Sequence, residues 1–316
     1  MIKRVPVILL LIAFCIFLSF YYPVLADLPD DIVWGYYSLI DDLPVSQMSA
    51  EVDANDVYDE FQGMDAAYVG PLPWEKDTKF QNAVNKLGSP VLMAAYRATL
   101  KEPLPGEEYN ISLAARKLAG TVVQPGQIFS QNKTLGPYTQ RRGFRPGPTY
   151  KGTDLVTTIG GGVCKIASVL YNLATFSDLE VVQRFPHSMT VPYVPPGQDA
   201  TVYYGVKDFR FKNTSSGPIL IWSQEIDNAL YIAFYGNRSS PKVTWHHQVL
   251  KRNKYWKEYK RNSSLSPGEE KVVLPGQDGF VVRSWVTVET DNGETIVRKK
   301  GVSYYSPGPE IIERAR

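Results

Sequence analysis

Residues 160–175, GGGVCKIASVLYNLAT, form the stretch of the sequence that decides the fold. After three consecutive glycines, apolar residues recur at the spacing i, i+4, i+7 and i+8: Ile166, Leu170, Leu173 and Ala174. This spacing predicts a helix with one apolar face packed on a core. Cys164 therefore falls in the first turn of the predicted helix.

Downstream of this helix, short apolar runs alternate with turn residues. They predict strands over residues 179–184, 189–194, 200–204, 209–212, 218–223 and 230–235. Asp227-Asn228 is a hairpin signal between the last two strands. Upstream, apolar spacing predicts helices over residues 81–100 and 109–118, the second capped by Asn110 or Ser112. We expect an α+β fold in which the Cys-bearing helix packs on a mostly antiparallel sheet.

The two ends of the chain differ from this central part. Residues 241–316 are β-rich and include the hairpin dipeptide Asn292-Gly293, which predicts a small all-β module. At the other end, Lys3 and Arg4 precede an apolar run over residues 5–25, with Ala26 at a possible cleavage position. Residues 1–26 are therefore expected to be a signal peptide or an N-terminal membrane anchor, and to make the only membrane contact. The remaining chain is expected outside the cytoplasm.

Charge is distributed unevenly along the exported part. Residues 27–75 contain twelve Asp or Glu and no Lys or Arg, whereas residues 76–316 contain 32 basic and 20 acidic residues, a net of plus twelve. We define residues 27–80 as an acidic N-terminal segment. The asymmetry has two interpretations: both parts are solvated surfaces, or the basic part, including residues 251–261, attracts anionic surface polymers.

Cys164 is the only cysteine outside residues 1–26, because Cys15 lies in the apolar run. A lone thiol in an exported protein has no disulfide partner, and it is either a small core residue or a reactive group. A helix N-terminus and the neighbouring Lys165 both favour the thiolate. The glycines before it let the backbone approach a ligand, and the N–H groups of residues such as Gly161 and Gly162 could face an oxyanion.

A thiolate nucleophile also needs a histidine and a group that orients it. His187 is the best candidate for the histidine, since it lies at the entrance to a predicted strand. Asp199, which follows a Pro-Gly turn, is the candidate orienting group, and Asp208 and Ser188 are its local competitors. An ordinary turn acceptor is the other interpretation of Asp199.

Other chemistries have little support in the sequence. With one cysteine and three histidines in the exported part, a zinc site of the usual type is not expected. His246 and His247 are adjacent on a predicted strand and point to opposite faces. The glycine run completes no nucleotide-binding motif, so we expect no metal, no cofactor and no nucleic-acid partner.

Several ordered blocks of the sequence resemble the VanW family of bacterial cell-envelope proteins. The resemblance covers about residues 83–236, and we assign residues 81–240 to a VanW-like domain. Its blocks are residues 110–120, 124–130, 160–164, 170–172, 187–188, 193–197, 199–202 and 211–213. The family pattern at the cysteine is usually Cys-Gln-x-Ser; in this sequence Lys165 stands in place of the Gln and Ala167 in place of the Ser. Residues 241–316 resemble a G5-type β module.

The resemblance implies a role at the extracellular face of the cell envelope, linked to peptidoglycan. Some VanW-domain proteins are understood as L,D-transpeptidases, which implies Cys164 as nucleophile, His187 as the motif histidine and Asp199 as the motif acid. Gly161, Gly162, Lys165 and Ser188 are then expected to contact substrate. The implied partners are peptidoglycan stem peptides and anionic wall polymers. A cysteine peptidase or carboxypeptidase and a noncatalytic wall-binding or scaffold protein are the alternatives.

Overall fold

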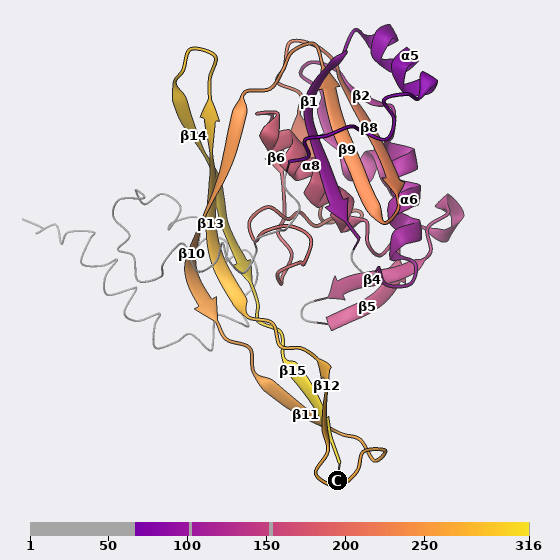
Figure 1. The fold of residues 1–316 in the computed structure, drawn as a ribbon, viewed down its shortest axis with the longest axis vertical. Helices are drawn as coiled ribbons and strands as arrows, with labels where there is room; N and C mark the ends of the chain where they lie inside the picture. The colour runs from indigo at the N-terminus through magenta and orange to yellow at the C-terminus, as the bar shows by residue number, and fades with distance from the viewer. Residues whose placement is uncertain (1–66, 101–102, 152–153, 316) are drawn as a thin grey trace, which may run out of the picture. The chain divides into compact units, whose positions relative to one another are not determined.

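The computed structural model describes residues 67–100, 103–151 and 154–315 (Figure 1). The predicted signal or anchor segment and most of the acidic segment lie outside these ranges. The helices are α5 (Thr78–Leu87), α6 (Glu107–Leu118), α7 (Gln131–Leu135), the 3-10 helix η2 (Gln140–Arg142) and α8 (Cys164–Phe176). Within the described ranges, none of the helices has the length and hydrophobicity that a bilayer crossing requires.

The first part of the described chain is built on a four-stranded antiparallel sheet with the order β1-β9-β8-β2. Its strands are β1 (Val91–Thr99), β2 (Thr121–Val123), β8 (Ile219–Ile226) and β9 (Ala229–Gly236). Smaller sheets contain β3 (Ile128–Ser130), β6 (Glu180–Gln183) and β7 (Arg210–Lys212), and β4 (Pro146–Lys151) with β5 (Asp154–Ile159). The hairpin predicted at Asp227-Asn228 is present, and both residues have positive φ angles.

Helices cover both faces of the four-stranded sheet. On one face, α6 and α8 bury their apolar residues against side chains such as Tyr96 and Ile232. On the other face, Phe80 and Val84 of α5 pack on Ala95 and neighbouring strand residues. Because successive strand residues point to opposite faces, Ala95 and Tyr96 serve the two cores. This is the α+β arrangement that the sequence predicts, with the Cys-bearing helix on an antiparallel sheet.

The C-terminal part is all-β. Its strands are β10 (Lys242–Asn253), β11 (Lys257–Arg261), β12 (Glu270–Leu274), β13 (Gly279–Glu289), β14 (Thr295–Tyr305) and β15 (Glu310–Arg314). They form one sheet with the order β10-β13-β14 and another with the order β11-β15-β12. The hairpin predicted at Asn292-Gly293 joins β13 to β14. Trp245, Val286 and Val288 of the first sheet belong to the same apolar cluster as α8, so the C-terminal strands contribute to the core beneath the Cys-bearing helix.

The predicted helix over residues 81–100 is wrong in its second half. The helix α5 ends at Leu87, because Gly88 takes a left-handed conformation with φ of 68° and its N–H bonds back to Val84 and Asn85. The chain then enters β1, which pairs with β9 along its length. The apolar residues that imitate helical spacing are therefore placed by sheet pairing.

The predicted caps of the next helix are also wrong. The N-cap position of α6 is Gly106, and Asn110 lies inside the helix. Asn110 is fully buried, and its side-chain amide donates to the carbonyl oxygens of Arg145 and Gly161, each at 2.9 Å. Its polar side chain thus ties the helix to the glycine turn before Cys164.

Candidate active site

Cys164 is the first residue of α8, as the sequence predicts. Its side chain is half-buried and packs against the main apolar cluster. The Sγ atom lies 3.4 Å from Thr201 Oγ1, and it accepts a hydrogen bond of 3.4 Å from the backbone N–H of Val202. The thiol therefore sits between a helix N-terminus and donors from a distant loop, an environment that favours a thiolate.

His187 and Asp199 form a buried pair beside this thiol. The Nδ1 atom of His187 lies 2.7 Å from Asp199 Oδ2, and the backbone N–H of His187 donates to the same oxygen at 2.6 Å. Since Nδ1 is engaged by the carboxylate, the ring reaches its hydrogen bond with Cys164 through Nε2. The structure thus brings the three residues together in the order thiol, imidazole, carboxylate.

The charges of these groups support one another. Burial alone would raise the pKa of the Cys164 thiol, but the hydrogen bond and charge of His187, with the hydrogen bonds of Thr201 and the Val202 backbone, outweigh it and the pKa is lowered. Burial alone would lower the pKa of His187, but Asp199 and Cys164 raise it to about 9. The pair therefore favours a thiolate beside an imidazolium at neutral pH.

Asp199 is held in the charged state by a buried arginine. Burial of this carboxyl would raise its pKa, yet Arg184 and His187 hold the pKa well below its usual range. Arg184 Nη2 lies 2.8 Å from Oδ1, and Arg184 Nε donates to the Asp199 carbonyl oxygen at 2.7 Å. The side chain of Asp199 is 1% exposed, so its charge depends on these partners rather than on water.

The loop that carries both residues, 184–202, is not made of strands. The strands predicted over residues 189–194 and 200–204 are absent, and only an isolated bridge at Tyr203 remains. Prolines at positions 186, 192, 195 and 196 lack the N–H groups that a sheet ladder requires. Side chains of α8 replace the ladder: Ser168 bonds both the N–H and the carbonyl of Ala200, and Asn172 donates to the carbonyl of Gln198. We call residues 184–202 the His–Asp loop.

Comparisons with known proteins agree with the predicted family resemblance. Residues 106–235 match the family model described as "VanW like protein", and residues 247–314 match the model described as "G5 domain". The chain carries a VanW-like domain followed by a G5 domain. Cys164, His187, Asp199 and the whole His–Asp loop lie inside the VanW-like domain.

Two curated relatives align with the VanW-like domain. The uncharacterized protein YoaR of Bacillus subtilis is 40% identical over 129 residues, which is 41% of this chain and 43% of that protein. The vancomycin B-type resistance protein VanW of Enterococcus faecalis is 28% identical over 119 residues, which is 36% of this chain and 43% of that protein. Each alignment thus covers less than half of the relative's length. A solved G5 domain of IgA1 protease aligns over 98% of its length and 26% of this chain, with 20% identity and a TM-score of 0.17.

The glycines of the VanW-like domain have a packing role in the structure. A Cβ atom on Gly161 would lie 2.1 Å from the carbonyl carbon and oxygen of Gly147, so the two backbones approach too closely for any side chain. Gly162 has a φ of 98°, in the left-handed region. Contact of Gly161 and Gly162 with substrate remains a prediction beside this packing role.

Lys165 and Ser188 differ in their surroundings. Lys165 is buried, its Nζ atom lies 3.6 Å from Glu107 Oε1 and 4.7 Å from the centre of the Tyr193 ring. Ser188 is exposed, and its carbonyl accepts a hydrogen bond of 2.6 Å from the backbone of Ser306. Contact of Lys165 and Ser188 with substrate therefore stays a prediction.

Of the groups considered for orienting His187, Asp199 is the one that binds its ring. Asp208 instead accepts hydrogen bonds from Ser130 and from the backbone of Asn132. Sequence reasoning missed Arg184, although it lies three residues before His187. A buried carboxylate needs a cationic partner, and this requirement is the signal that could have found it.

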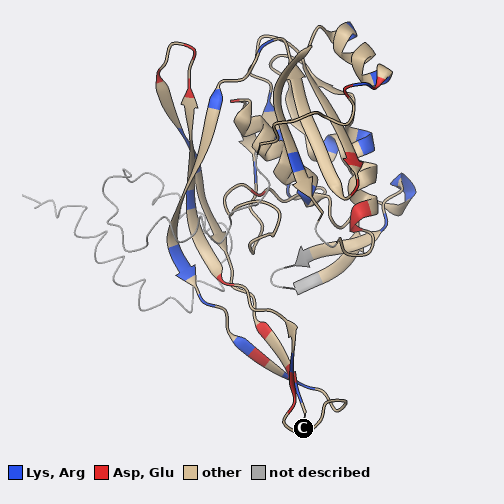
Figure 2. Ribbon diagram, viewed as in Figure 1, with Lys and Arg blue, Asp and Glu red and all other residues tan. Residues whose placement is uncertain are grey.

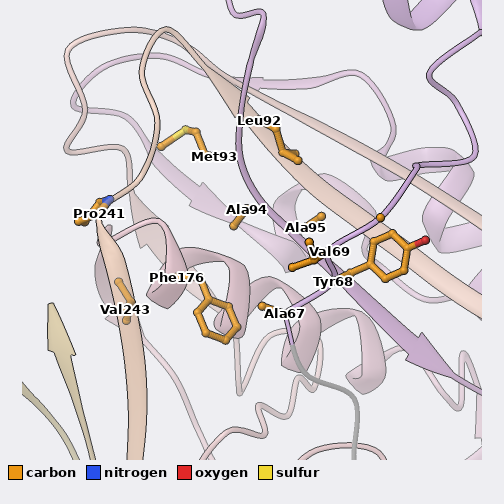
Figure 3. A pocket seen from close by; sticks show the side chains of 11 residues that line it. Ala67, Tyr68, Val69, Leu92, Met93, Ala94, Ala95, Phe176, Pro241 and Val243 are labelled. Carbon is orange, nitrogen blue, oxygen red and sulfur yellow. The ribbon is translucent and has the colours of Figure 1, made fainter. Parts of the chain in front are cut away.

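The structure also has a cavity of about 310 Å³ away from these residues (Figure 3). It is lined mainly by apolar side chains, which include Tyr68, Leu92, Met93, Phe176 and Val243. None of the predicted site residues lines it. The chemistry predicted from the sequence is therefore centred on the N-terminus of α8 and not on this cavity.

Proposed function

We propose that this chain is a cell-wall-associated enzyme, located outside the cytoplasm, that carries out cysteine-dependent acyl transfer on peptidoglycan stem peptides. The family matches support a role at the cell wall, since one relative is named for resistance to vancomycin, an antibiotic that acts on the wall. The reaction is an L,D-transpeptidation, with Cys164 as nucleophile, His187 as acid and base, and Asp199 as the orienting group.

One observation carries the proposal: a half-buried thiol at a helix N-terminus has a lowered pKa because a histidine fixed by a buried carboxylate faces it. This arrangement matches the requirements of a thiol nucleophile. An inert core cysteine would have a raised pKa, because burial disfavours the thiolate. The VanW-like domain supplies the link to the cell wall, and the site supplies the link to acyl transfer.

The reaction balances without a cofactor. The Cys164 thiolate attacks a stem-peptide carbonyl, and the His187 imidazolium gives its proton to the departing amine of the terminal D-amino acid. The product is a thioester and a neutral imidazole. The amine of a neighbouring stem then attacks the thioester, His187 takes its proton, and the thiolate leaves as the cross-link forms.

The test is incubation of the purified chain with tetrapeptide muropeptides, followed by mass spectrometry of the products. We expect cross-linked dimers together with released D-alanine, and we expect Cys164→Ala to abolish both. A second variant, His187→Ala, removes the proposed acid and base, and His246→Ala is its matched control. His246 lies on β10, where it stacks on Trp285 and bonds Thr287 rather than the thiol. Absence of both dimer and D-alanine with the wild-type chain would refute the proposal.

Released D-alanine without dimers would instead identify a cysteine carboxypeptidase. Hydrolysis and transfer share the thioester and differ only in whether water or an amine resolves it. The same assay therefore separates the two enzyme classes. The ratio of dimer to D-alanine measures the choice.

A noncatalytic wall-binding function is the second candidate, and one surface feature favours it. The strand β11 is exposed along its length, and basic residues flank Glu258 and Tyr259 in it; Figure 2 shows the strand in blue and red. Tyr259 is 48% exposed, and the Arg314 guanidinium lies 4.8 Å from its ring centre. A surface of this kind suits an anionic polymer. If Cys164→Ala retains the full cellular function of the chain, this candidate replaces the enzyme.

A further inference from the structure

The His–Asp loop is held from two sides. On one side, Ser168 and Asn172 of α8 bond its backbone. On the other side, residues of the C-terminal β part do the same. Gln277 Nε2 donates to the Thr190 carbonyl at 2.9 Å, and the backbone N–H of Ser306 donates to the Ser188 carbonyl at 2.6 Å.

The contacts from β14 reach the charged groups themselves. The Tyr305 hydroxyl donates to Asp199 Oδ1 at 2.5 Å and accepts a hydrogen bond from the backbone N–H of Gly197 at 2.6 Å. Ser303 Oγ accepts from Arg184 Nη1 at 2.7 Å. Ser303 and Tyr305 are two residues apart on one strand, so both side chains point to the same face.

These contacts complete the environment of the carboxylate. Asp199 Oδ2 receives both donors of His187, and Oδ1 receives Arg184 and Tyr305. Tyr305 is fully buried, so its hydroxyl has no water to replace these partners. If the hydroxyl were lost, Oδ1 would keep only its hydrogen bond from Arg184 Nη2, and the carboxylate would be free to turn toward Arg184 and away from the imidazole.

The close approach of the His–Asp loop to β13 is a second sign that the C-terminal part holds Asp199 in place. Gly197 has a φ of 92°, and a Cβ atom there would lie 2.0 Å from Ser284 Oγ. The turn before Asp199 is thus packed directly against the C-terminal sheet, and a side chain at Gly197 would push the two apart. The position of Asp199 therefore depends on a part of the chain outside the VanW-like match.

We propose that Tyr305 is a positioning residue of the Cys164–His187–Asp199 site, and that the G5 region thereby completes the active site of the VanW-like domain. The inference rests on the proposed function, but it concerns how the site is held rather than what it acts on. It assigns the C-terminal part a role in the state of the thiol, in addition to any contact with the wall.

The charged and titratable groups around the thiol and imidazole come from each element packed on them. From the His–Asp loop they are Asp199, Arg184 and Tyr193, whose ring lies edge-on to His187. The ring of Tyr171 on α8 packs against the Arg184 guanidinium. Tyr138 is near enough to Cys164 for the two charges to interact, and Lys165, which follows Cys164, lies over the Tyr193 ring. Tyr305 is the group from β14. Replacing Tyr305 by phenylalanine removes one hydroxyl and leaves each of the other groups in the chain.

The experiment uses the full chain and measures the pH dependence of Cys164 alkylation by iodoacetamide, read by mass spectrometry on the peptide that contains Cys164. We expect Tyr305→Phe to shift the midpoint upward by about half a unit to one unit, because a less well-held imidazolium favours the thiolate less. The control is Tyr235→Phe, which removes another buried hydroxyl, bonded to Trp74 at 2.8 Å, in a different apolar cluster. Tyr235→Phe should lose about as much thermal stability as Tyr305→Phe but keep the wild-type midpoint of Cys164 alkylation.

Ser303→Ala is the second variant, for the case that Tyr305→Phe does not fold. It should shift the midpoint in the same direction, since it frees one nitrogen of Arg184. An unchanged or lowered midpoint in a folded Tyr305→Phe, or in Ser303→Ala when the first variant does not fold, overturns the proposal. A wild-type midpoint at the ordinary thiol value overturns both this inference and the proposed function. If Cys164 of the wild type is alkylated at mildly acidic pH but the muropeptide assay gives no transfer product, only the proposed reaction is refuted. The alkylation midpoints of the variants then still decide the role of Tyr305.

Discussion

Replacing His187 by alanine is expected to remove the reactivity of Cys164 at mildly acidic pH. In the folded chain, burial raises the pKa of this thiol, and His187 together with hydrogen bonds from Thr201 and the Val202 backbone lowers it by more. Without the imidazole, burial acts against donors from Thr201 and the Val202 backbone alone. The thiol is then expected to titrate near or above its ordinary pKa of 9.0.

The size of the effect follows from the fraction of thiolate at pH 6. A thiol of ordinary pKa is about one part in a thousand ionised at this pH, whereas an ion-paired thiol is mostly ionised. The rate of alkylation could therefore fall by about 1000-fold. A thiolate of lower pKa is a weaker nucleophile, which reduces the ratio by roughly 15- to 30-fold, so a loss of about 30- to 60-fold is expected.

The assay is a series of iodoacetamide rate constants between pH 5 and 9, measured on the Cys164 peptide so that Cys15 does not contribute. The wild-type rate should already be high at pH 6, and the His187→Ala rate should rise steadily toward pH 9. His246→Ala should follow the wild type. Equal profiles for His187→Ala and wild type, or labelling of Cys164 only after unfolding, would refute the reasoning.

Three further predictions concern stability. Asp199→Asn should lower the free energy of unfolding by about 3–5 kcal/mol in urea titrations, because the buried charge of Arg184 loses its partner; a loss below about 1 kcal/mol would contradict this. Gly161→Ala should cost about 1–3 kcal/mol by thermal melting, since its Cβ would lie 2.1 Å from Gly147, while Gly308→Ala, whose nearest atom is at 3.7 Å, should cost far less. Burial, then His246, lowers the pKa of His247 to about 4, so the stability that neutral His247 provides is present above pH 6.5 and lost as the pH falls toward 4. Between pH 7 and pH 4, the wild type should therefore lose about 1–2 kcal/mol more of its free energy of unfolding than His247→Gln does. If the two proteins lose the same stability over this range, the lowered pKa of His247 is contradicted.

The core helix was predictable from the sequence because its signals are local. The glycine run, the apolar spacing and the lone cysteine all lie within residues 160–175, and the structure begins α8 at Cys164. The hairpins at Asp227-Asn228 and Asn292-Gly293 were predictable for the same reason, since turn chemistry is a property of a few adjacent residues.

The failures occurred where distant partners decide the conformation. Residues 91–99 imitate a helix but pair with β9, which lies about 140 positions further along the chain. The His–Asp loop contains β-branched residues, yet its prolines prevent a ladder and side chains of α8 take over its hydrogen bonds. Tyr305 is 106 residues from Asp199, and a tyrosine on a strand has no local feature that indicates a bond to a carboxylate.

The arrangement of charges also explains why the site tolerates burial. Arg184, Asp199, His187 and Cys164 form a series of alternating positive and negative groups, with a net charge of zero when the thiolate and imidazolium are paired. In the proposed reaction, the thiolate charge disappears as the thioester forms, and the imidazolium charge disappears as its proton moves to the departing amine. The two losses balance, so Arg184 and Asp199 remain as a neutral pair throughout. Each reaction state therefore leaves no unpaired charge in the interior, which limits the electrostatic cost of the chemical step.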